Sequence, residues 1–130
     1  MNNALMVEIS PGELIDKITI LEIKMEKITD ELRLSNVRVE LKSLLQAKKS
    51  YLQDLSKVSE LIAKLKEINQ NLWEIEDDLR QFERMKEFGP RFIALARSVY
   101  KKNDLRAQLK RQINEALGSN LKEEKSYANY

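Results

Sequence analysis

The spacing of apolar residues in the first third of the chain is typical of an amphipathic helix. Apolar side chains recur there at alternating steps of four and three residues, which is the period of one helix face. The members of this series are Leu14, Ile18, Leu21, Met25, Ile28 and Leu32. The series then stops, because the next positions in phase include Ser35 and Lys42. A turn or sharp bend is therefore expected between Thr29 and Asn36.

A second apolar series runs through the middle of the chain with a step of seven residues throughout. It consists of Val37, Leu44, Tyr51, Val58, Leu65, Leu72 and Leu79. The apolar residues that accompany this series change position partway along, near Asp54 and Ser56. Because Asp and Ser also favour turns, this change indicates another turn. One continuous helix across residues 34–87 is the alternative.

The residues that break helices occupy only three places. All the prolines and glycines of the chain lie in Pro11-Gly12, Gly89-Pro90 and Gly118. Ser10 and Glu13 flank the first pair with the spacing of a helix start: a capping serine, a proline in the first helical position and an acid that completes a capping box. The pair Gly89-Pro90 is expected to form a tight corner between two helices, packed by the aromatic residues on either side.

These patterns predict an all-α protein, an antiparallel helical bundle of three to four helices with a long third helix. The helices are expected at residues 11–28, 35–53, 56–87 and 91–117, and residues 118–130 form a tail. A short extended segment at Leu5–Ile9 precedes the first helix. Residues 1–130 are expected to form a single helical domain, which suits the length of the chain.

The composition restricts the chemistry that the chain could perform. Charged residues make up 34% of the chain and hydrophobic residues 42%, a balance that fits helices with solvated outer faces rather than a disordered chain. There is no cysteine and no histidine, which removes thiolate metal ligands, cysteine nucleophiles and the commonest general base. We therefore expect no catalytic residue, no metal site and no cofactor.

The overall charge and the apolar runs restrict the partners in the same way. Lys and Arg total 23 and Asp and Glu total 21, so the net charge of +2 offers no global reason for binding nucleic acid or membranes. No apolar run approaches the ~20 residues that span a bilayer. The first residues lack the basic start and long apolar stretch of a signal peptide. We expect a cytoplasmic protein.

Charge is nevertheless segregated along the chain. Seven acids and three bases lie between Glu67 and Glu87, whereas six bases and one acid lie between Arg97 and Arg111. Two antiparallel neighbouring helices with complementary faces are the simplest interpretation. A basic groove for phosphate or nucleic acid is the alternative, but Tyr100 is the only aromatic residue among those bases and a glycine-rich phosphate loop is missing. Nucleic acid is therefore a disfavoured partner.

The first helix is apolar on more than one side. Besides its main series it carries Ile20 and Ile23 on the opposite side of the helical wheel. A helix that is apolar nearly all round has to be covered nearly all round. We therefore expect self-association, with a two-fold homodimer through the first helix as the default and another protein as a further candidate partner. The alternative is that residues 1–10 and the C-terminal tail cover this second stripe within one chain.

Arg106 is unusual because it lies in the middle of the apolar face of the last helix. An unpaired buried charge is too costly, so we expect an ion pair with Glu76 or Glu83 across the bundle. A sharper hypothesis is a polar pocket for an anionic small molecule. Its candidate ligand-binding residues are Lys17, Asn69, Glu76, Arg91, Arg97, Asn103, Arg106 and Lys110. Trp73 lies off the core stripe and is expected at an interface.

Several separated sequence runs resemble one known family. These runs are residues 7–24 (VEISPGELIDKITILEIK), 69–77 (NQNLWEIED), 88–100 (FGPRFIALARSVY), 103–104 (ND) and 123–127 (EEKSY). Together they are similar to DUF6165, a family of small bacterial and phage proteins of unknown function. The resemblance implies an all-helical domain and brings no activity, cofactor or catalytic residue.

Two hypotheses about function come from different classes. The first is a helical interaction or assembly module that self-associates and has no catalytic activity. The second is a small all-helical enzyme or anionic-ligand-binding protein with a chorismate-mutase-like arrangement, since Leu14–Ile18 is loosely similar to the first helix of that fold. The first helix here lacks the arginine that such a fold uses for the substrate carboxylate. We favour the interaction module.

Overall fold

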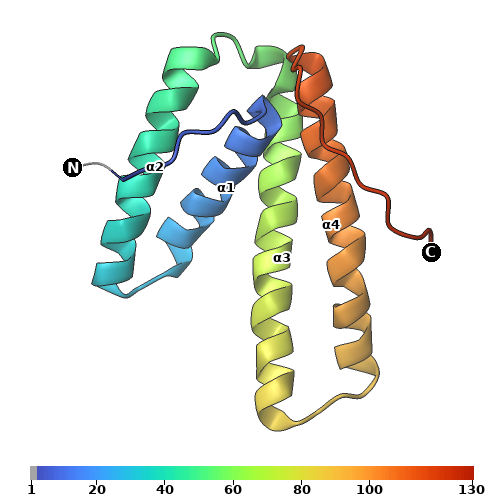
Figure 1. The fold of residues 1–130 in the computed structure, drawn as a ribbon. Coiled ribbons are helices and arrows are strands. Elements are labelled where there is room, and N and C mark those ends of the chain that lie inside the picture. Colours follow the sequence, from blue (N-terminus) through green and yellow to red (C-terminus); the bar gives the residue numbers. More distant parts are fainter. Residues whose placement is uncertain (1–2) are drawn as a thin grey trace.

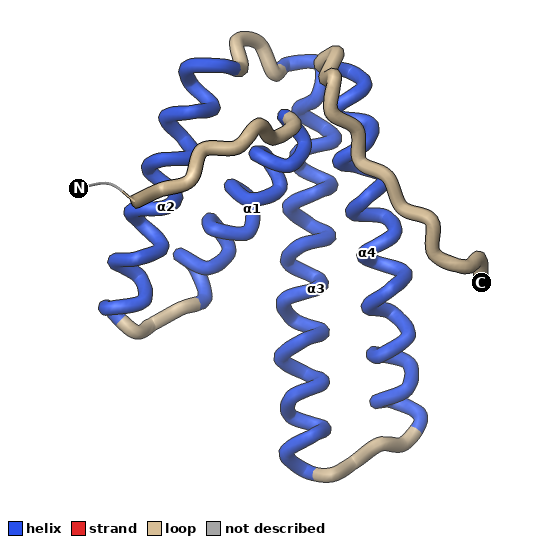
Figure 2. Tube along the Cα trace, viewed as in Figure 1, coloured by secondary structure: helices blue, strands red, loops and turns tan. Residues whose placement is uncertain are grey.

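The computed structural model describes residues 3–130, and these residues form four α-helices and one short 3-10 helix. The elements are α1 (Pro11–Lys27), α2 (Glu31–Tyr51), η1 (Ser56–Val58), α3 (Ser59–Met85) and α4 (Pro90–Ala116). Figure 1 shows two antiparallel hairpins, α1–α2 and α3–α4, which meet at one end and diverge toward the other. Only helices and loops occur in the described part of the chain (Figure 2), so the expected all-α bundle with a long third helix is confirmed.

The start of α1 follows the local signals in its sequence. The Ser10 hydroxyl oxygen accepts a hydrogen bond from the Glu13 amide at 3.1 Å, and Pro11 occupies the first helical turn. The helix then ends at Ile28, whose backbone is extended. Local capping chemistry therefore accounts for both the position and the sharpness of this N-terminus.

The second helix begins earlier than its apolar spacing predicts. We expected it from residue 35, but α2 starts at Glu31, because the Asp30 carboxylate accepts a hydrogen bond from the Arg33 amide at 3.0 Å and caps the helix. The break at Thr29 and Asp30 is correspondingly shorter than expected. The capping acid sets the residue at which the helix begins, whereas the apolar series indicates only which face of the helix packs against the rest of the protein.

The chain also turns between the second and third helices. The backbone becomes extended at Leu52, and the Asp54 carboxylate accepts a hydrogen bond from the Ser56 amide at 3.0 Å as η1 begins. The alternative of one continuous helix across residues 34–87 is therefore wrong. The turn lies where the apolar companions change position.

A tight corner joins α3 to α4 at the far end of the second hairpin. Lys86 adopts the left-handed conformation with φ of 55°, which allows the Glu87 amide to donate to the Phe82 carbonyl at 3.0 Å. The Phe92 ring packs edge-on against Phe88 and Phe82, with ring centroids 5.1 and 6.4 Å away. The expected packing of aromatic residues at this corner is thus present, and Pro90 opens α4 directly after it.

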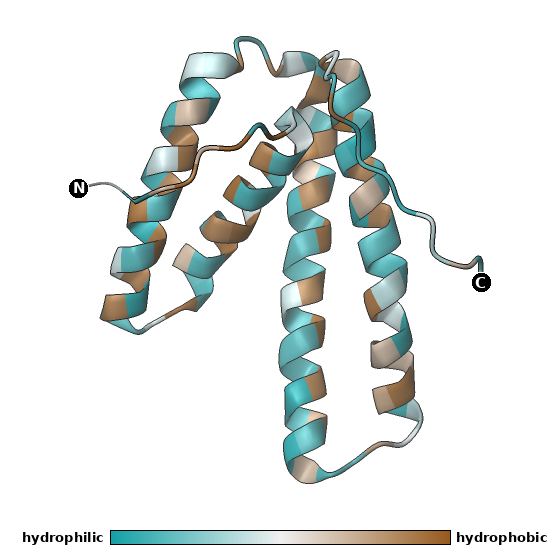
Figure 3. Ribbon diagram, in the orientation of Figure 1, coloured by the Kyte–Doolittle hydropathy of each residue, from teal (hydrophilic) through white to brown (hydrophobic). Residues whose placement is uncertain are grey.

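The hydrophobic core lies at the end where the two hairpins meet. Ile15, Leu65 and Ile113 pack together there and are almost completely buried. Smaller contributions come from partly buried apolar residues around them, namely Leu52, Leu55, Leu61, Ile62, Leu109 and Leu117. Along the rest of α3 the apolar residues follow the side of the ribbon that faces α4 (Figure 3). The core therefore holds the hairpins together at one end only.

Helix α1 is covered on nearly all sides by the other helices of its own chain. It packs against α2, α3 and α4, and Ile23 of its second apolar stripe is only 1% exposed. The N-terminal segment does not provide this cover, since residues 3–9 have no regular structure and are exposed. A second copy is therefore not needed to bury Ile23.

None of the described helices is long and apolar enough to cross a membrane.

Candidate functional site

The most distinctive polar arrangement in the structure is centred on Asp16 in α1, which is completely buried. Its carboxylate receives two hydrogen bonds from the Arg106 guanidinium on α4, one from Nε at 2.9 Å and one from Nη2. It receives a third from the amide nitrogen of Asn69 on α3 at 2.9 Å. One carboxylate thus connects three helices through charge-assisted hydrogen bonds.

Two further hydrogen bonds complete this cluster. The Asn69 amide nitrogen also donates to the Thr19 hydroxyl oxygen at 2.9 Å, and that hydroxyl donates to the Asp16 backbone carbonyl at 2.7 Å. Asn69 and Thr19 are both buried. Because buried polar groups stabilise a fold only when they find partners, this closed set of bonds specifies one way of docking α1 onto α3 and α4.

A second layer of contacts binds the N-terminus of α1 to α4. The buried Lys110 ammonium lies 2.7 Å from the Glu13 carboxylate and 3.3 Å from that of Glu123 in the tail. The Gly12 amide donates to the Asn114 side-chain oxygen at 2.7 Å. Gly12 also allows a close approach of the two backbones, because a Cβ at this position would lie 2.6 Å from the Lys110 carbonyl oxygen.

The electrostatics keep these groups ionised. Burial alone would raise the pKa of Asp16, but the hydrogen bonds from Arg106 and Asn69 and the charges of Arg106 and Lys110 lower it below its ordinary value. The hydrogen bond to Asp16 raises the pKa of Arg106. Burial lowers the pKa of Lys110, yet the hydrogen bond to Glu13 and the surrounding carboxylates raise it overall. The cluster is a set of stable ion pairs.

The structure brings together half of the residues predicted to bind a ligand. Asn69, Asn103, Arg106 and Lys110 lie in or beside the cluster, and Arg106 Nη1 also donates to the Asn103 side-chain oxygen at 3.5 Å. The other four candidates form no hydrogen bond or ion pair with Asp16, Asn69 or Arg106.

The remaining candidates have local partners or face solvent. Lys17 lies 3.8 Å from Glu13 on the surface of α1, and Glu76 forms an ion pair with Arg80 one turn along α3. Arg91 stacks over the Phe82 ring at 5.5 Å, near the far corner of the hairpin. Arg97 is exposed on α4. Of these four side chains, only Glu76 lines a cavity together with Arg106, and Lys17, Arg91 and Arg97 do not.

The expected partner of Arg106 was wrong. The structure pairs Arg106 with Asp16 and not with Glu76 or Glu83, because α1 packs against both α3 and α4 and presents an acid to the middle of the apolar face of α4. Asp16 belongs to the sequence run that resembles the family, yet it was not a candidate. A usable signal existed, since Asp16 precedes Ile20 and Ile23 at helical spacing and therefore shares the buried side of α1.

A cavity of about 640 Å³ lies between α4 and the C-terminal tail. Tyr100, Arg106 and Lys110 of α4 line it together with Tyr127 and Tyr130 of the tail. Ion pairs hold the tail in place, with Lys125 at 3.0 Å from Asp104 and Glu123 on Lys110. Since each cation at this cavity already faces a carboxylate, the cavity has no excess positive charge for an anion.

A second cavity, of about 420 Å³, opens between α1 and α3 where the hairpins diverge. Trp73 lines it together with Ile20 and Leu72, so the tryptophan is a half-buried wall residue. Glu76 and Asp77 add acidic groups on the α3 side. Within residues 3–130 no group of three acids, histidines or cysteines is arranged to hold a metal ion.

Comparison with known proteins gives a family and nothing further. The model of the family of unknown function DUF6165 matches residues 5–130, nearly the whole chain. No curated protein and no solved structure matches the sequence. The resemblance carried by the separated sequence runs is thereby confirmed: the chain is a member of the DUF6165 family.

Proposed function

We propose that this protein is a non-catalytic helical interaction module that self-associates through the free part of its α3–α4 hairpin. We call residues 74–105 the arm. In the arm only Ile75 is buried, and it retains 9% exposure. The arm therefore has a continuous apolar stripe but almost no buried core, and the proposal rests on this observation.

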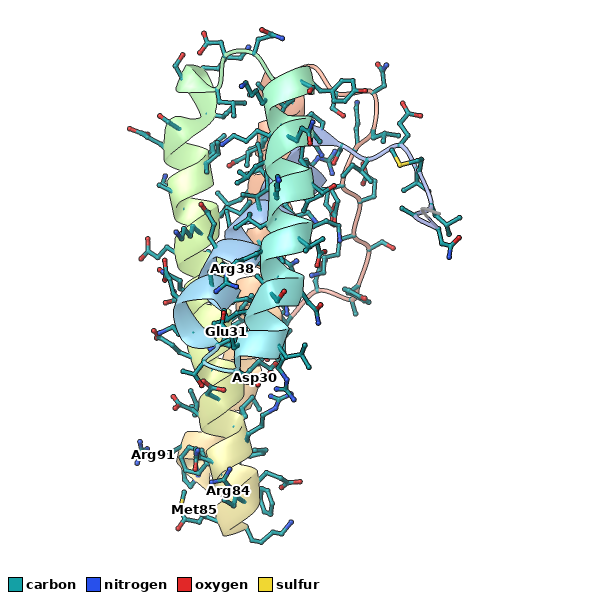
Figure 4. All side chains as sticks on the ribbon, turned by 90° about the vertical axis from the view of Figure 1, so that its left-hand side faces the viewer. Asp30, Glu31, Arg38, Arg84, Met85 and Arg91 are labelled. Carbon is teal, nitrogen blue, oxygen red and sulfur yellow. The ribbon has the colours of Figure 1, made fainter. Side chains whose placement is uncertain are left out.

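The arm is supported by the other helices at its base only. Figure 1 shows that α3 and α4 extend past the ends of α1 and α2, and in Figure 4 Arg84, Met85 and Arg91 lie well beyond both helices. Most helical stability in proteins comes from packing an amphipathic face rather than from helix propensity. A pair of helices covers only the faces between them, so the arm gains stability from a partner.

Large apolar side chains are exposed on the arm and at its corner. Met85, Phe88, Ile93, Tyr100 and Leu105 are between 42% and 53% exposed. Such a concentration marks an interaction surface in a soluble helical protein. The first helix offers no comparable surface, because its apolar residues pack within the chain.

The polar cluster supports a structural role for the charged residues near Asp16. Arg106 and Lys110, the two cations most favourable for an anionic ligand, each face a carboxylate of the same chain. A small enzyme or anionic-ligand-binding protein would need such cations to be available to its ligand. The geometry therefore favours the interaction module, and we propose that it acts in the cytoplasm.

Sedimentation velocity of the full chain at tens of micromolar tests the proposal. The expected mass is that of two chains. Replacing Met85 and Leu105 on the arm by Lys should give the mass of one chain with unchanged helix content. The matched control is Val39→Lys, because Val39 is 70% exposed on α2, outside the arm. A parent protein with the mass of one chain would overturn self-association.

A further inference from the structure

The two helices of the arm present opposite charges on the same side. We call this side the back face, because it lies opposite α1. Asp78 and Met85 of α3 line one shallow depression together with Ala94 of α4. Helical spacing places Glu74 beside Asp78, one turn away, and Lys101 two turns from Ala94 on the same side of α4. The back face thus has an acidic α3 and a basic α4.

Helix α1 does not cover the back face. Asn69 and Arg106, which bind Asp16, lie on the other side of the hairpin. The C-terminal tail binds α4 through Asp104 and Lys110 and reaches only the edge of the back face, where its residues line a cavity with Lys101 and Leu105. Only residues of α3, α4 and the corner between them line the depression.

These charges have no partners within the chain. Across the described residues, no ion pair joins α3 to α4, although the two helices pack side by side. Glu74, Asp78, Lys101 and Lys102 form no ion pair anywhere in residues 3–130. The complementary charges expected to pair these neighbouring helices are therefore free to pair with another molecule.

We propose that the occupant of the back face is a second copy of this chain, with α3 of each copy packed antiparallel against α4 of the other. This inference rests on the proposed self-association and specifies its geometry. A two-fold axis parallel to the helices creates two equivalent contacts, because both copies use the same surface. In each contact an acidic α3 packs against a basic α4. The result is a four-helix bundle in which every neighbouring pair of helices is antiparallel.

The register of the hairpin makes the charges meet at the same height. The contact between Phe82 and Phe92 places Glu74 level with Tyr100, next to Lys101. A two-fold axis along the bundle preserves this height, so Glu74 of one copy lies level with Lys101 of the other. Met85 and Leu105 lie on the same side and supply the apolar contacts that charge pairing alone does not provide.

Other occupants fit the back face less well. An arrangement with α3 against α3 would oppose two acidic helices, and like charges across an interface disfavour association. A nucleic acid bound to Lys101 and Lys102 would meet the acids of α3 about one helix diameter, ~10 Å, away, within the range of unscreened repulsion. A second copy is the partner whose charges match both helices.

Charge reversal on the full chain tests this geometry. The first variant carries Glu74→Lys and Asp78→Lys, and the second carries Lys101→Glu and Lys102→Glu. Each alone should raise the dissociation constant of the homodimer at least about tenfold, because each places like charges across both contacts. An equimolar mixture should form a heterodimer, since every contact then joins opposite charges. Combining all four changes in one chain should also restore the homodimer.

The control for general charge attraction is a variant with Lys48→Glu and Lys49→Glu on α2, which has the same net charge as the second variant. Mixed with the first variant, it should give much less heterodimer than the second variant does, because only one of the two contacts then joins opposite charges. Circular dichroism of each variant establishes that it is folded. A parent with the mass of one chain would overturn both proposals. A parental dimer that neither variant weakens, or a mixture of the two variants that stays monomeric, would overturn this geometry and leave self-association standing.

Discussion

Arg106 and Asp16 lie 90 residues apart in the chain and form a two-pronged ion pair, in which Nε and Nη2 of the guanidinium donate to the two oxygens of the carboxylate. The Asp16 side chain is 1% exposed and the Arg106 side chain 29%. This pair joins the first helix to the last at the base of the arm, so it decides how the two hairpins dock.

Arg106→Ala should lower the free energy of unfolding by roughly 3–5 kcal/mol, because it strands a buried carboxylate. Replacing Arg106 by Met together with Asp16 by Leu should recover most of this loss, since no unpaired charge remains. Urea unfolding followed by circular dichroism measures both. Arg97→Ala is the control, because Arg97 is exposed on the same helix. A single variant as stable as the parent would show that Arg106 serves something other than this pair.

The stability of the protein should fall in acid through Asp16. Its folded pKa is below the ordinary value of 3.8, so its contribution is fully present above that value and is lost as the pH falls through the lower, folded pKa. In Asp16→Asn the free energy of unfolding should be lower at pH 7 and should depend less on pH below about 4. Urea titrations at a series of acidic pH values measure the slope. An unchanged slope would contradict the assignment.

Gly12→Ala should destabilise the protein by about 1–3 kcal/mol, the usual cost of overpacking. The added Cβ would lie 2.6 Å from the Lys110 backbone carbonyl oxygen, which cannot move without moving α4. Gly89→Ala is the matched control, since a Cβ there meets nothing within 4 Å and the φ of −79° suits alanine. Thermal unfolding of the two variants should separate them clearly. Equal effects would mean that the close approach of α1 and α4 is absent in solution.

Lys86→Gly should stabilise the corner of the arm by about 0.5–1 kcal/mol, because a non-glycine residue is strained in the left-handed conformation that Lys86 adopts. Lys86→Ala, which removes the charge and keeps the Cβ, should show no such gain. Chemical denaturation of both variants gives the comparison. A glycine variant no more stable than the alanine variant would argue against the left-handed cap.

The positions of the helices follow from signals that act within one turn of the chain. Ser10 and Pro11 start α1 where the sequence predicts it, and Gly89 and Pro90 separate the last two helices for the same local reason. Where prediction failed, at the start of α2, another local signal was present in the Asp30 cap. Capping bonds reach only three residues, so a single sequence contains what is needed to place helix ends.

The arrangement of the two hairpins relative to each other does not follow from signals within one turn of the chain. Arg106 could be recognised as unusual, because helical periodicity places a charge in an apolar face. That Asp16 is its partner depends on α1 packing against both α3 and α4, and Glu76 or Glu83 fitted the same local pattern equally well. The docking angle results from packing many side chains on three helices at once, whereas helical periodicity describes only one helix at a time.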